Sequence, residues 1–245
     1  MKTSSKILLI TFIATLILMA AMVFVAKNYI DKNVERASGK ITTLTYQPGD
    51  FDKIKIAGGF DVTMVYGELT SVDITVDEAF QKHIKVNATN NTLQISSANL
   101  IQNFNTKILI TANHINEINL SAGVTLIGKD SLKSDNFTLK TSAGSSANIT
   151  GTFGKFFCTA SAGSQVTLHG TSQHSQLSAS AGSMVAATSF STDTCNANTS
   201  SGSEINISVI SFLDAEASSG SSIQYSGSPV IGKQSTSSGA IIKKM

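Results

Sequence analysis

Residues 139–168 read LKTSAGSSANITGTFGKFFCTASAGSQVTL, and this stretch contains the triplet Ser-Ala-Gly twice. The broader triplet Ser-(Ala/Ser)-Gly occurs seven times in the 245-residue chain, with 18 to 21 residues from each glycine to the next. A period of this length is typical of architectures in which similar units stack on one another. The seven glycines, which we expect at structural repeat corners, are Gly123, Gly144, Gly163, Gly182, Gly202, Gly220 and Gly239.

Apolar or small residues alternate with polar ones on both sides of each glycine. This period of two is typical of strands with one buried face. The row five residues before the glycine contains Ile118, Leu139, Cys158, Leu177, Ala197 and Ala215. The row three residues after it contains Leu126, Ala147, Val166, Val185, Ile205, Ile223 and Ile242.

The repeat predicts an all-β fold, a single-stranded parallel β-solenoid (β-helix) with coils of about 19–20 residues. Glycine suits the corner of a coil because it adopts positive φ without a Cβ clash. Stacking would pair each strand in parallel with its counterpart one repeat later, about 4.8 Å away. Two rows of serines, two residues before and one residue after the glycine, would then bond along the stack through their hydroxyl groups.

An apolar segment precedes the β-rich sequence. Residues 7–26 are uncharged and mostly apolar, and as a helix they would span about 30 Å, enough to cross a bilayer core. Lys2 and Lys6 precede them, which favours an N-terminus inside the cell. We expect residues 1–27 to be a transmembrane signal anchor, with the membrane as its partner, or alternatively a cleaved signal peptide. Residues 28–46 are expected to be a linker, and the β domain is expected outside the cytoplasm, in the cell envelope.

Residues 47–120 alternate in the manner of strands but lack the triplet. Residues 54–56 and 60–64 flank a glycine pair, which is typical of two strands around a glycine turn. We interpret residues 47–120 as an irregular N-terminal β part of the same architecture, which would cap the regular repeats of residues 121–245. A separate small β-sandwich is the alternative interpretation.

The composition argues against a nucleic-acid partner. Only 14% of residues are charged, compared with about 25% in typical soluble domains. The net charge is +2, and Arg36 is the single arginine. Binders of phosphate or acidic sugars favour arginine because its guanidinium group forms two parallel hydrogen bonds with the anion.

The two cysteines test the expected register of the coils. Cys158 and Cys195 lie two coil steps apart, about 9–10 Å along the stack. A disulfide requires Cα atoms within about 7 Å of each other. We therefore predict two free, buried thiols, and a bridge between them would mean that the register is wrong.

No residue pattern typical of an active site is found. The four histidines lack a second ligand at metal-binding spacing, and we expect His169 and His174 on either side of a loop. Asp214 and Glu216 alternate on an outward face without a facing row of acids, whereas a glycosidase needs two carboxylates across its substrate. The sequence thus predicts no enzyme and no catalytic, cofactor-binding or metal-binding residues.

Three segments together, residues 51–64, 72–76 and 92–95, resemble the autotransporter adhesin head GIN domain family of Bacteroidetes-type bacteria. The later Ser-Ala-Gly-Ser repeats are similar to the C-terminal half of that family, so that the resemblance covers residues 47–245. It implies an exported β-solenoid with an envelope or surface location and an adhesive role. No catalytic residues come with the family.

The favoured function is a non-catalytic, adhesin-like binding protein at the surface or in the periplasm. Its Ser-, Thr- and Asn-rich face offers hydroxyl and amide groups for weak, repeated contacts with a glycan or protein ligand. One alternative is a structural module for envelope assembly, and a further one is a polysaccharide-acting solenoid enzyme. The absence of tryptophan and the presence of only four tyrosines argue against strong sugar stacking.

Overall fold

The computed structural model describes residues 3–33, 37–97 and 106–245. The chain divides into two compact units, Met1–Ser38 and Gly39–Met245. Each unit has its own secondary structure, and the second contains all of the predicted repeats.

The first unit contains one helix, α1 (Thr3–Asn33), over the apolar segment. Its described apolar side chains, among them Leu18, Met22 and Phe24, are exposed in this unit. Across the described parts of the chain, no helix combines the length and the apolarity that crossing a membrane requires. The membrane span predicted over residues 7–26 is therefore not confirmed.

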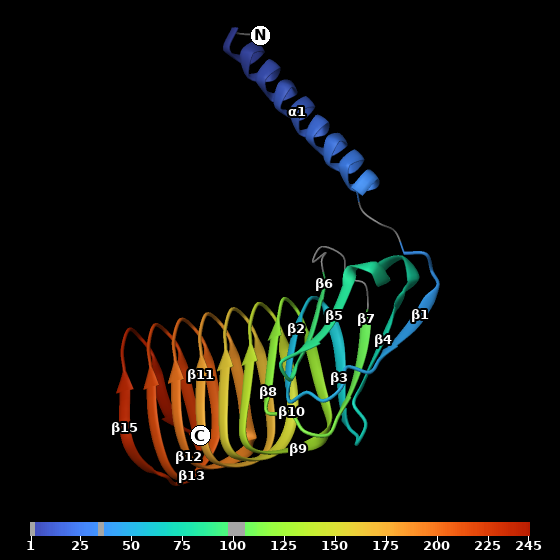
Figure 1. The fold of residues 1–245 in the computed structure, drawn as a ribbon. Helices are drawn as coiled ribbons and strands as arrows, with labels where there is room; N and C mark the ends of the chain where they lie inside the picture. Colours follow the sequence, from blue (N-terminus) through green and yellow to red (C-terminus); the bar gives the residue numbers. More distant parts are fainter. Residues whose placement is uncertain (1–2, 34–36, 98–105) are drawn as a thin grey trace. The chain divides into compact units, whose positions relative to one another are not determined.

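The second unit is a β-solenoid built from a 16-stranded sheet, which confirms the predicted fold class (Figure 1). One short 3₁₀ helix, η1, interrupts the strands. The described elements are β1 (Ile41–Tyr46), β2 (Lys53–Ala57), β3 (Phe60–Tyr66), β4 (Ser71–Asp77), η1 (Glu78–His83), β5 (Ile84–Thr89), β6 (Thr92–Ser97), β7 (Thr106–Ala112), β8 (Glu117–Ser121), β9 (Thr125–Thr141), β10 (Ser146–Ala160), β11 (Gln165–Ala179), β12 (Met184–Thr199), β13 (Glu204–Ala217), β14 (Ser222–Ser226), β15 (Val230–Thr236) and β16 (Ile241–Lys244).

Strands β9 to β13 stack in parallel, one coil on the next, as Figure 1 shows. The residues three positions after the corner glycine lie opposite one another through the whole stack, and so do those five positions before it. For example, Ala147 pairs with Val166 and Val166 with Val185. Both predicted rows are interior rows, because the spacing of the triplet places equivalent residues at equivalent points of successive coils.

Each regular coil is one long bent strand, whereas the sequence suggested two short strands around each corner. Pairing between β10 and β11 continues through the bend, where Gly151 lies opposite Gly170. Gly170 has a φ of 113°, and a Cβ on it would lie 1.9 Å from the carbonyl oxygen of Gly151. Glycine therefore lets two coils approach closely at a bend that has no recurrent sequence triplet.

The seven triplets form tight corners in which two residues, not only the glycine, adopt the left-handed conformation. At one corner Ala143 has a φ of 50° and Gly144 a φ of 69°. The N–H of Ser145 donates to the carbonyl of Ser142 at 3.2 Å. Positive φ at both central residues is the geometry of a type I′ turn.

Corner residues bond from coil to coil through their backbones. The N–H of Gly144 donates to the carbonyl of Ala162 in the next coil at 3.0 Å, and five other corner glycines do the same. Ser164, one position after its glycine, is buried, accepts from the N–H of Ser161 at 3.0 Å and donates to the carbonyl of Thr141 at 3.1 Å.

The two serine rows thus have different roles. Hydroxyl groups of the row after the glycine bond mainly to backbone groups and not to one another. Among the described residues, the hydroxyl groups of the row before the glycine make no hydrogen bond, so the ladder predicted there is wrong. The buried row therefore satisfies backbone groups at the corners.

The N-terminal strands continue the same sheet. Strand β2 pairs in parallel with β8, with Ile54 opposite Ile118, and β3 pairs in parallel with β9. Strands β1, β4 and β5 add antiparallel pairs, which the regular coils lack. The irregular part and the repeats therefore share one sheet, unlike the separate sandwich considered as an alternative.

The interior of the regular coils contains one cluster of aromatic rings near the bends. Phe137, Phe153, Phe156 and Phe190 form this buried cluster, with ring centroids 4.8 to 6.2 Å apart. Elsewhere the interior rows mix leucine and isoleucine, such as Leu168, with alanine, valine, serine and threonine. Packing against these rows forces the intervening side chains of each strand outward, and this creates the surface described next.

Candidate binding surface

One face of the regular coils is a lattice of outward side chains from the residues that precede each corner. We call this surface the ladder face. Neighbouring coils are about 4.8 Å apart and neighbouring rows about 6.8 Å apart. Its three rows are Asn136, Lys155, His174, Thr194 and Phe212; Thr138, Phe157, Gln176, Asn196 and Asp214; and Lys140, Thr159, Ser178, Asn198 and Glu216.

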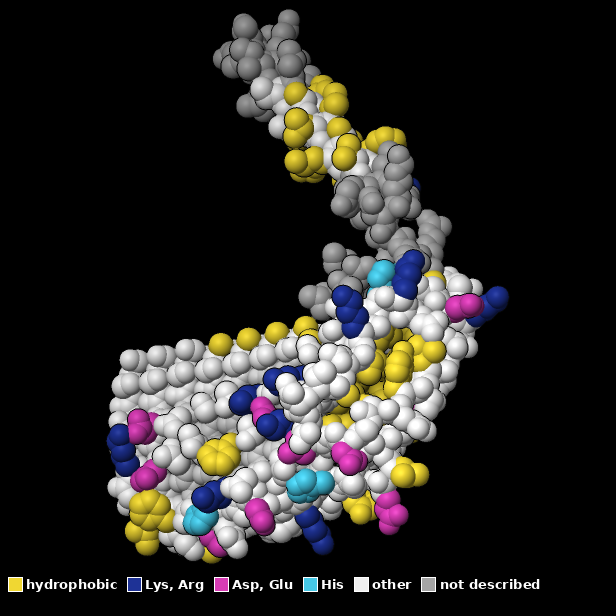
Figure 2. Space-filling model, viewed as in Figure 1, with side chains coloured by type: hydrophobic (Ala, Val, Ile, Leu, Met, Phe, Trp, Pro, Cys, Tyr) yellow, Lys and Arg dark blue, Asp and Glu magenta, His cyan; other side chains and the backbone are white. Residues whose placement is uncertain are grey.

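The ladder face offers a ligand side chains only. Strands β10 to β13 each pair with a strand on both sides, so their backbone N–H and C=O groups are used within the sheet. Figure 2 shows charged groups, histidines and a few isolated hydrophobic side chains spread over this face. Recognition here would depend on the chemistry and spacing of those side chains.

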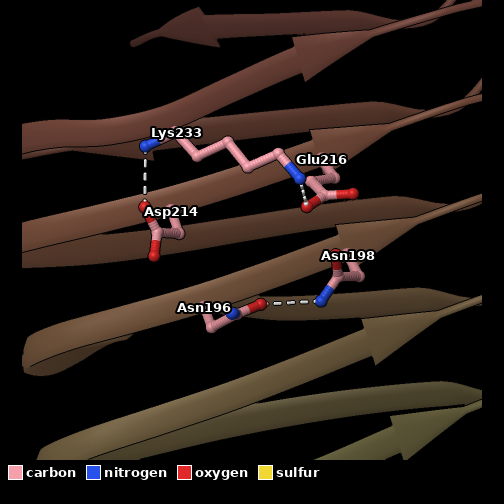
Figure 3. Close-up of polar contacts among 5 residues, drawn as sticks. All are labelled: Asn196, Asn198, Asp214, Glu216 and Lys233. Carbon is pink, nitrogen blue, oxygen red and sulfur yellow. Dashed lines mark hydrogen bonds and ion pairs between the residues drawn. The ribbon is translucent and has the colours of Figure 1, made fainter.

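The two outward acids share one lysine (Figure 3). The backbone N–H of Lys233 donates to Asp214 Oδ1 at 2.7 Å, and its Nζ donates to Glu216 Oε1. The hydrogen bond to Glu216 and the charge of that carboxylate raise the pKa of Lys233. In the preceding coil, Asn198 Nδ2 donates to Asn196 Oδ1 at 2.7 Å. Asp214 and Glu216 thus belong to a polar cluster on one face and do not face each other across a cleft.

A second ion pair lies toward the N-terminal strands. Lys140 Nζ is 3.5 Å from Glu117 Oε1, which also accepts a hydrogen bond from Asn119 Nδ2 at 2.8 Å. Partial burial acts to raise the pKa of Glu117, but the hydrogen bond from Asn119 and the neighbouring positive charge of Lys140 outweigh it, and the pKa is lowered. Charged groups at the two ends of the ladder face are therefore paired.

Between these ends, the ladder face contains a hollow of about 390 Å³. Phe157 and Phe212 border it, with 39% and 38% of their surfaces exposed. His174 and Gln176 lie between them, and His174 Nδ1 is hydrogen-bonded to Thr194 Oγ1 at 2.8 Å. We call this feature the aromatic-walled hollow, and its volume lies in the range of small-ligand sites.

A smaller cavity of about 290 Å³ lies where β3 and β9 diverge. Met64 and Ile115 form an apolar floor, and His114 and Asp130 lie at the rim. The Asp130 carboxylate accepts the backbone N–H of Tyr66 at 2.8 Å, which ties the two strands together. This bond gives Asp130 a structural role at the junction of the irregular and regular parts.

The structure places the predicted residues as follows. The seven glycines occupy the corners, outside the aromatic-walled hollow. His169 and His174 both lie within β11, so the loop expected between them is wrong. The described residues contain no group of three potential metal ligands. Sequence reasoning missed the hollow, although Phe157 and Phe212 interrupt otherwise polar outward rows and were a usable signal.

Both cysteines are free and buried, as predicted. Cys158 lies opposite Leu177, and Cys195 lies opposite Ser175, so the two thiols are in different interior rows. Burial raises the pKa of both thiols to about 12. A protonated interior thiol is a poor nucleophile. Cys195 lies beneath the aromatic-walled hollow and is 3% exposed, whereas Cys158 lies outside it.

Fold and surface together define the chain as a parallel β-solenoid protein with a side-chain lattice on one face. The model of the family described as "Putative auto-transporter adhesin, head GIN domain" matches residues 50–229, and the chain belongs to this family. The family resemblance predicted from the sequence is thereby confirmed.

Several crystal structures share the fold. A "putative adhesin" from Bacteroides fragilis is 22% identical with a TM-score of 0.79, over 85% of this chain and 99% of that one. A "putative adhesin" from Parabacteroides merdae is 15% identical with a TM-score of 0.67, over 85% and 98% of the two chains. A "putative lipid binding protein" from Parabacteroides distasonis is 18% identical with a TM-score of 0.68 over the same shares. No curated protein matched the sequence.

Proposed function

We propose that the protein is a non-catalytic, adhesin-like binding protein of the cell envelope, and that the ladder face is its binding surface. The observation that carries this proposal is the pairing of strands β10 to β13 on both sides, which leaves only their side chains for a partner. Membership of a family described as adhesins supports the same role. The flat lattice suits many weak contacts better than it suits enclosure of a reacting group.

The absence of enzymatic activity is part of the proposal. Asp214 and Glu216 are the acids that a polysaccharide-acting enzyme would use on this face, and both are bound by Lys233. General acid–base chemistry on a glycosidic bond needs two carboxylates on opposite sides of the substrate. Side by side on one sheet, these two acids are suited to holding β15 against β13.

A binding experiment tests this function. Purified full-length protein is applied to arrays of glycans and of extracellular-matrix proteins, beside a variant with Gln176→Lys and Asn196→Lys on the ladder face. We expect saturable binding that the two lysines abolish, while circular dichroism stays unchanged. Absence of binding on both arrays would contradict the proposal and favour a structural module of the envelope.

The envelope location has its own test. The apolar sequence of residues 7–26 and the family description support export of the β unit. Cell fractionation followed by protease treatment of intact cells or spheroplasts should recover the protein in the envelope fraction, with the β unit accessible from outside the cytoplasm. Recovery in the cytoplasmic fraction would contradict this location.

A further inference from the structure

Two phenylalanine rings outside the buried aromatic cluster border the aromatic-walled hollow. Phe157 and Phe212 point away from the interior, whereas the buried cluster beside them already contains Phe156. Phe157 lies in β10 and Phe212 in β13, three coil steps apart, so that about 14 Å separates them along the stack. Two rings at this spacing cannot stack on each other. The Phe212 ring packs over Gly232 of β15, where a Cβ would lie 2.2 Å from the ring, and the exposed parts of both rings remain available to a ligand.

Two polar side chains of the lining have no partner in the part of the protein that the structure describes, whereas His174 and Asn196 each make one hydrogen bond. Among the described residues, Lys155 and the side chain of Gln176 make no hydrogen bond or ion pair. Asn196 accepts a bond from Asn198 and keeps its own amide N–H groups unused. Amides both donate and accept, which matches the dual character of sugar hydroxyl groups.

Other ligand classes fit the hollow less well. A peptide that adds as a strand needs free backbone groups at a sheet edge, and β10 to β13 provide none. An acidic polymer would favour clustered arginines, and the single arginine, Arg36, lies outside the described residues. The lining contains one positive group, Lys155, and one negative group, Asp214, so that its formal charges sum to zero, which favours a neutral ligand.

We propose that the aromatic-walled hollow binds a neutral oligosaccharide. Sugar rings would stack their C–H faces on Phe157 and Phe212, and Gln176, Asn196 and His174 would bond the hydroxyl groups between them. Aromatic faces carry partial negative charge, so polarised C–H groups favour them. This assignment rests on the proposed function, since it names the ligand class of the same ladder face, and it gives the stacking role to phenylalanines in a chain without tryptophan.

The test uses the full-length protein and immobilised chitohexaose, mannohexaose and cellohexaose, with hyaluronan and heparin as acidic counterparts. We expect saturable binding to at least one neutral hexasaccharide and weaker binding to both acidic chains. The double variant Phe157→Ala, Phe212→Ala should lose at least about tenfold in affinity, because two ring contacts are removed. The variant Phe157→Tyr, Phe212→Tyr keeps both rings and should retain binding.

Matched controls separate a lost contact from a lost fold. Ile127→Ala removes an apolar side chain that is 41% exposed outside the hollow, and it should bind like the parent protein. Equal affinity of the double alanine variant and the parent would overturn the oligosaccharide site. Binding to matrix proteins without binding to any of the sugars would overturn only this inference and leave the proposed function standing. Binding to neither would overturn both.

Discussion

The irregular N-terminal strands and the regular coils bury different kinds of residues in one continuous sheet. Strands β2 to β8 place large aliphatic side chains inside, among them Ile54, Leu93 and Ile108. In the regular coils, the interior rows mix large aliphatic side chains such as Leu168 with small ones such as Ala147, and large rings occur in the cluster near the bends. Apolar burial thus stabilises both regions, and the regular coils add hydrogen bonds from a row of buried serines.

The two regions also turn their chains differently. The hairpin between β5 and β6 uses Asn90 and Asn91, both with positive φ. Asparagine tolerates this conformation well. The regular corners instead combine alanine or serine with glycine, although alanine is unfavourable at positive φ. Small corner residues allow the carbonyl of each corner to accept the glycine N–H of the coil before it. These hydrogen bonds between coils outweigh the unfavourable positive φ of the alanine or serine.

The largest effect is expected in the aromatic cluster of the regular coils. Phe156→Ala should lower the free energy of unfolding by about 3–5 kcal/mol, because the ring is fully buried against Phe153 and Phe190. Urea denaturation followed by circular dichroism measures this. The matched control is Phe157→Ala, the next residue, whose ring is 39% exposed and should cost far less. Equal losses would mean that the cluster is not a core.

A similar loss of stability is expected in the interior of the N-terminal strands. Ile108→Ala should lower the free energy of unfolding by about 2–5 kcal/mol, because it leaves a cavity among large neighbours. Leu109→Ala, on the outward side of the same strand and 37% exposed, provides the control. If both variants unfold at the same urea concentration, the interior position of Ile108 is contradicted.

A smaller loss is expected at a corner. Ser183→Ala should lower the free energy of unfolding by about 0.5–1.5 kcal/mol, because the buried hydroxyl donates to the carbonyl of Ala160 at 2.8 Å. Ser180→Ala in the same corner removes a hydroxyl without a hydrogen bond among the described residues and should be nearly neutral. The melting temperatures of the two variants are compared by thermal unfolding. An unchanged melting temperature of Ser183→Ala would contradict a stabilising role of the buried serine hydrogen bonds in the regular coils.

Exchanging the turn residues of the two regions should change stability in opposite directions. Ala181→Asn places a residue that favours positive φ at a corner and should raise the free energy of unfolding by up to about 1 kcal/mol. Asn90→Ala in the hairpin should lower it by a comparable amount. A destabilised Ala181→Asn variant would show that corner packing requires a methyl-sized side chain.

The smallest effect concerns the two thiols buried in the regular coils and appears only at high pH. Unfolding exposes thiols that ionise near pH 9, whereas the folded thiols keep their protons until about pH 12. Their contribution is therefore intact below pH 9 and is lost as the pH rises from 9 to 12. Between pH 9 and pH 12, the free energy of unfolding should fall less in the double variant Cys158→Ala, Cys195→Ala than in the parent protein. At pH 8 the native protein should not react with a thiol reagent, and two equivalents should react after unfolding.

The sequence was most informative where geometry repeats. A constant triplet fixed the coil length, the parallel pairing and the interior rows, and these rows placed Cys158 and Cys195 too far apart for a disulfide. The bends were not predictable in the same way. Coil lengths differ, and the extra residues enter as register shifts such as that between Thr167 and His169, which no triplet marks.

Pairing of the N-terminal strands was equally hidden. Alternation identified the segments around Val72 and Ile108 as strands, but it carries no information on partner or direction, and β4 and β7 prove to be antiparallel. The aromatic-walled hollow depends on side chains from coils that are distant in sequence. Phe157 and Phe212 come together on one face only because three successive registers place them there.

The corner hydrogen bonds have a consequence for how such a gene can change. At successive corners, the glycine N–H of one coil donates to the carbonyl of the residue that precedes the corner glycine of the next coil. Each coil therefore offers the same donor to the coil after it and the same acceptor to the coil before it. Unequal recombination between the repeats can then add or remove one complete coil without leaving a mismatched joint. Each such event would lengthen or shorten the display surface by about 4.8 Å. Relatives of different length are expected to differ by whole coils, so that the length of the solenoid changes in steps of one coil.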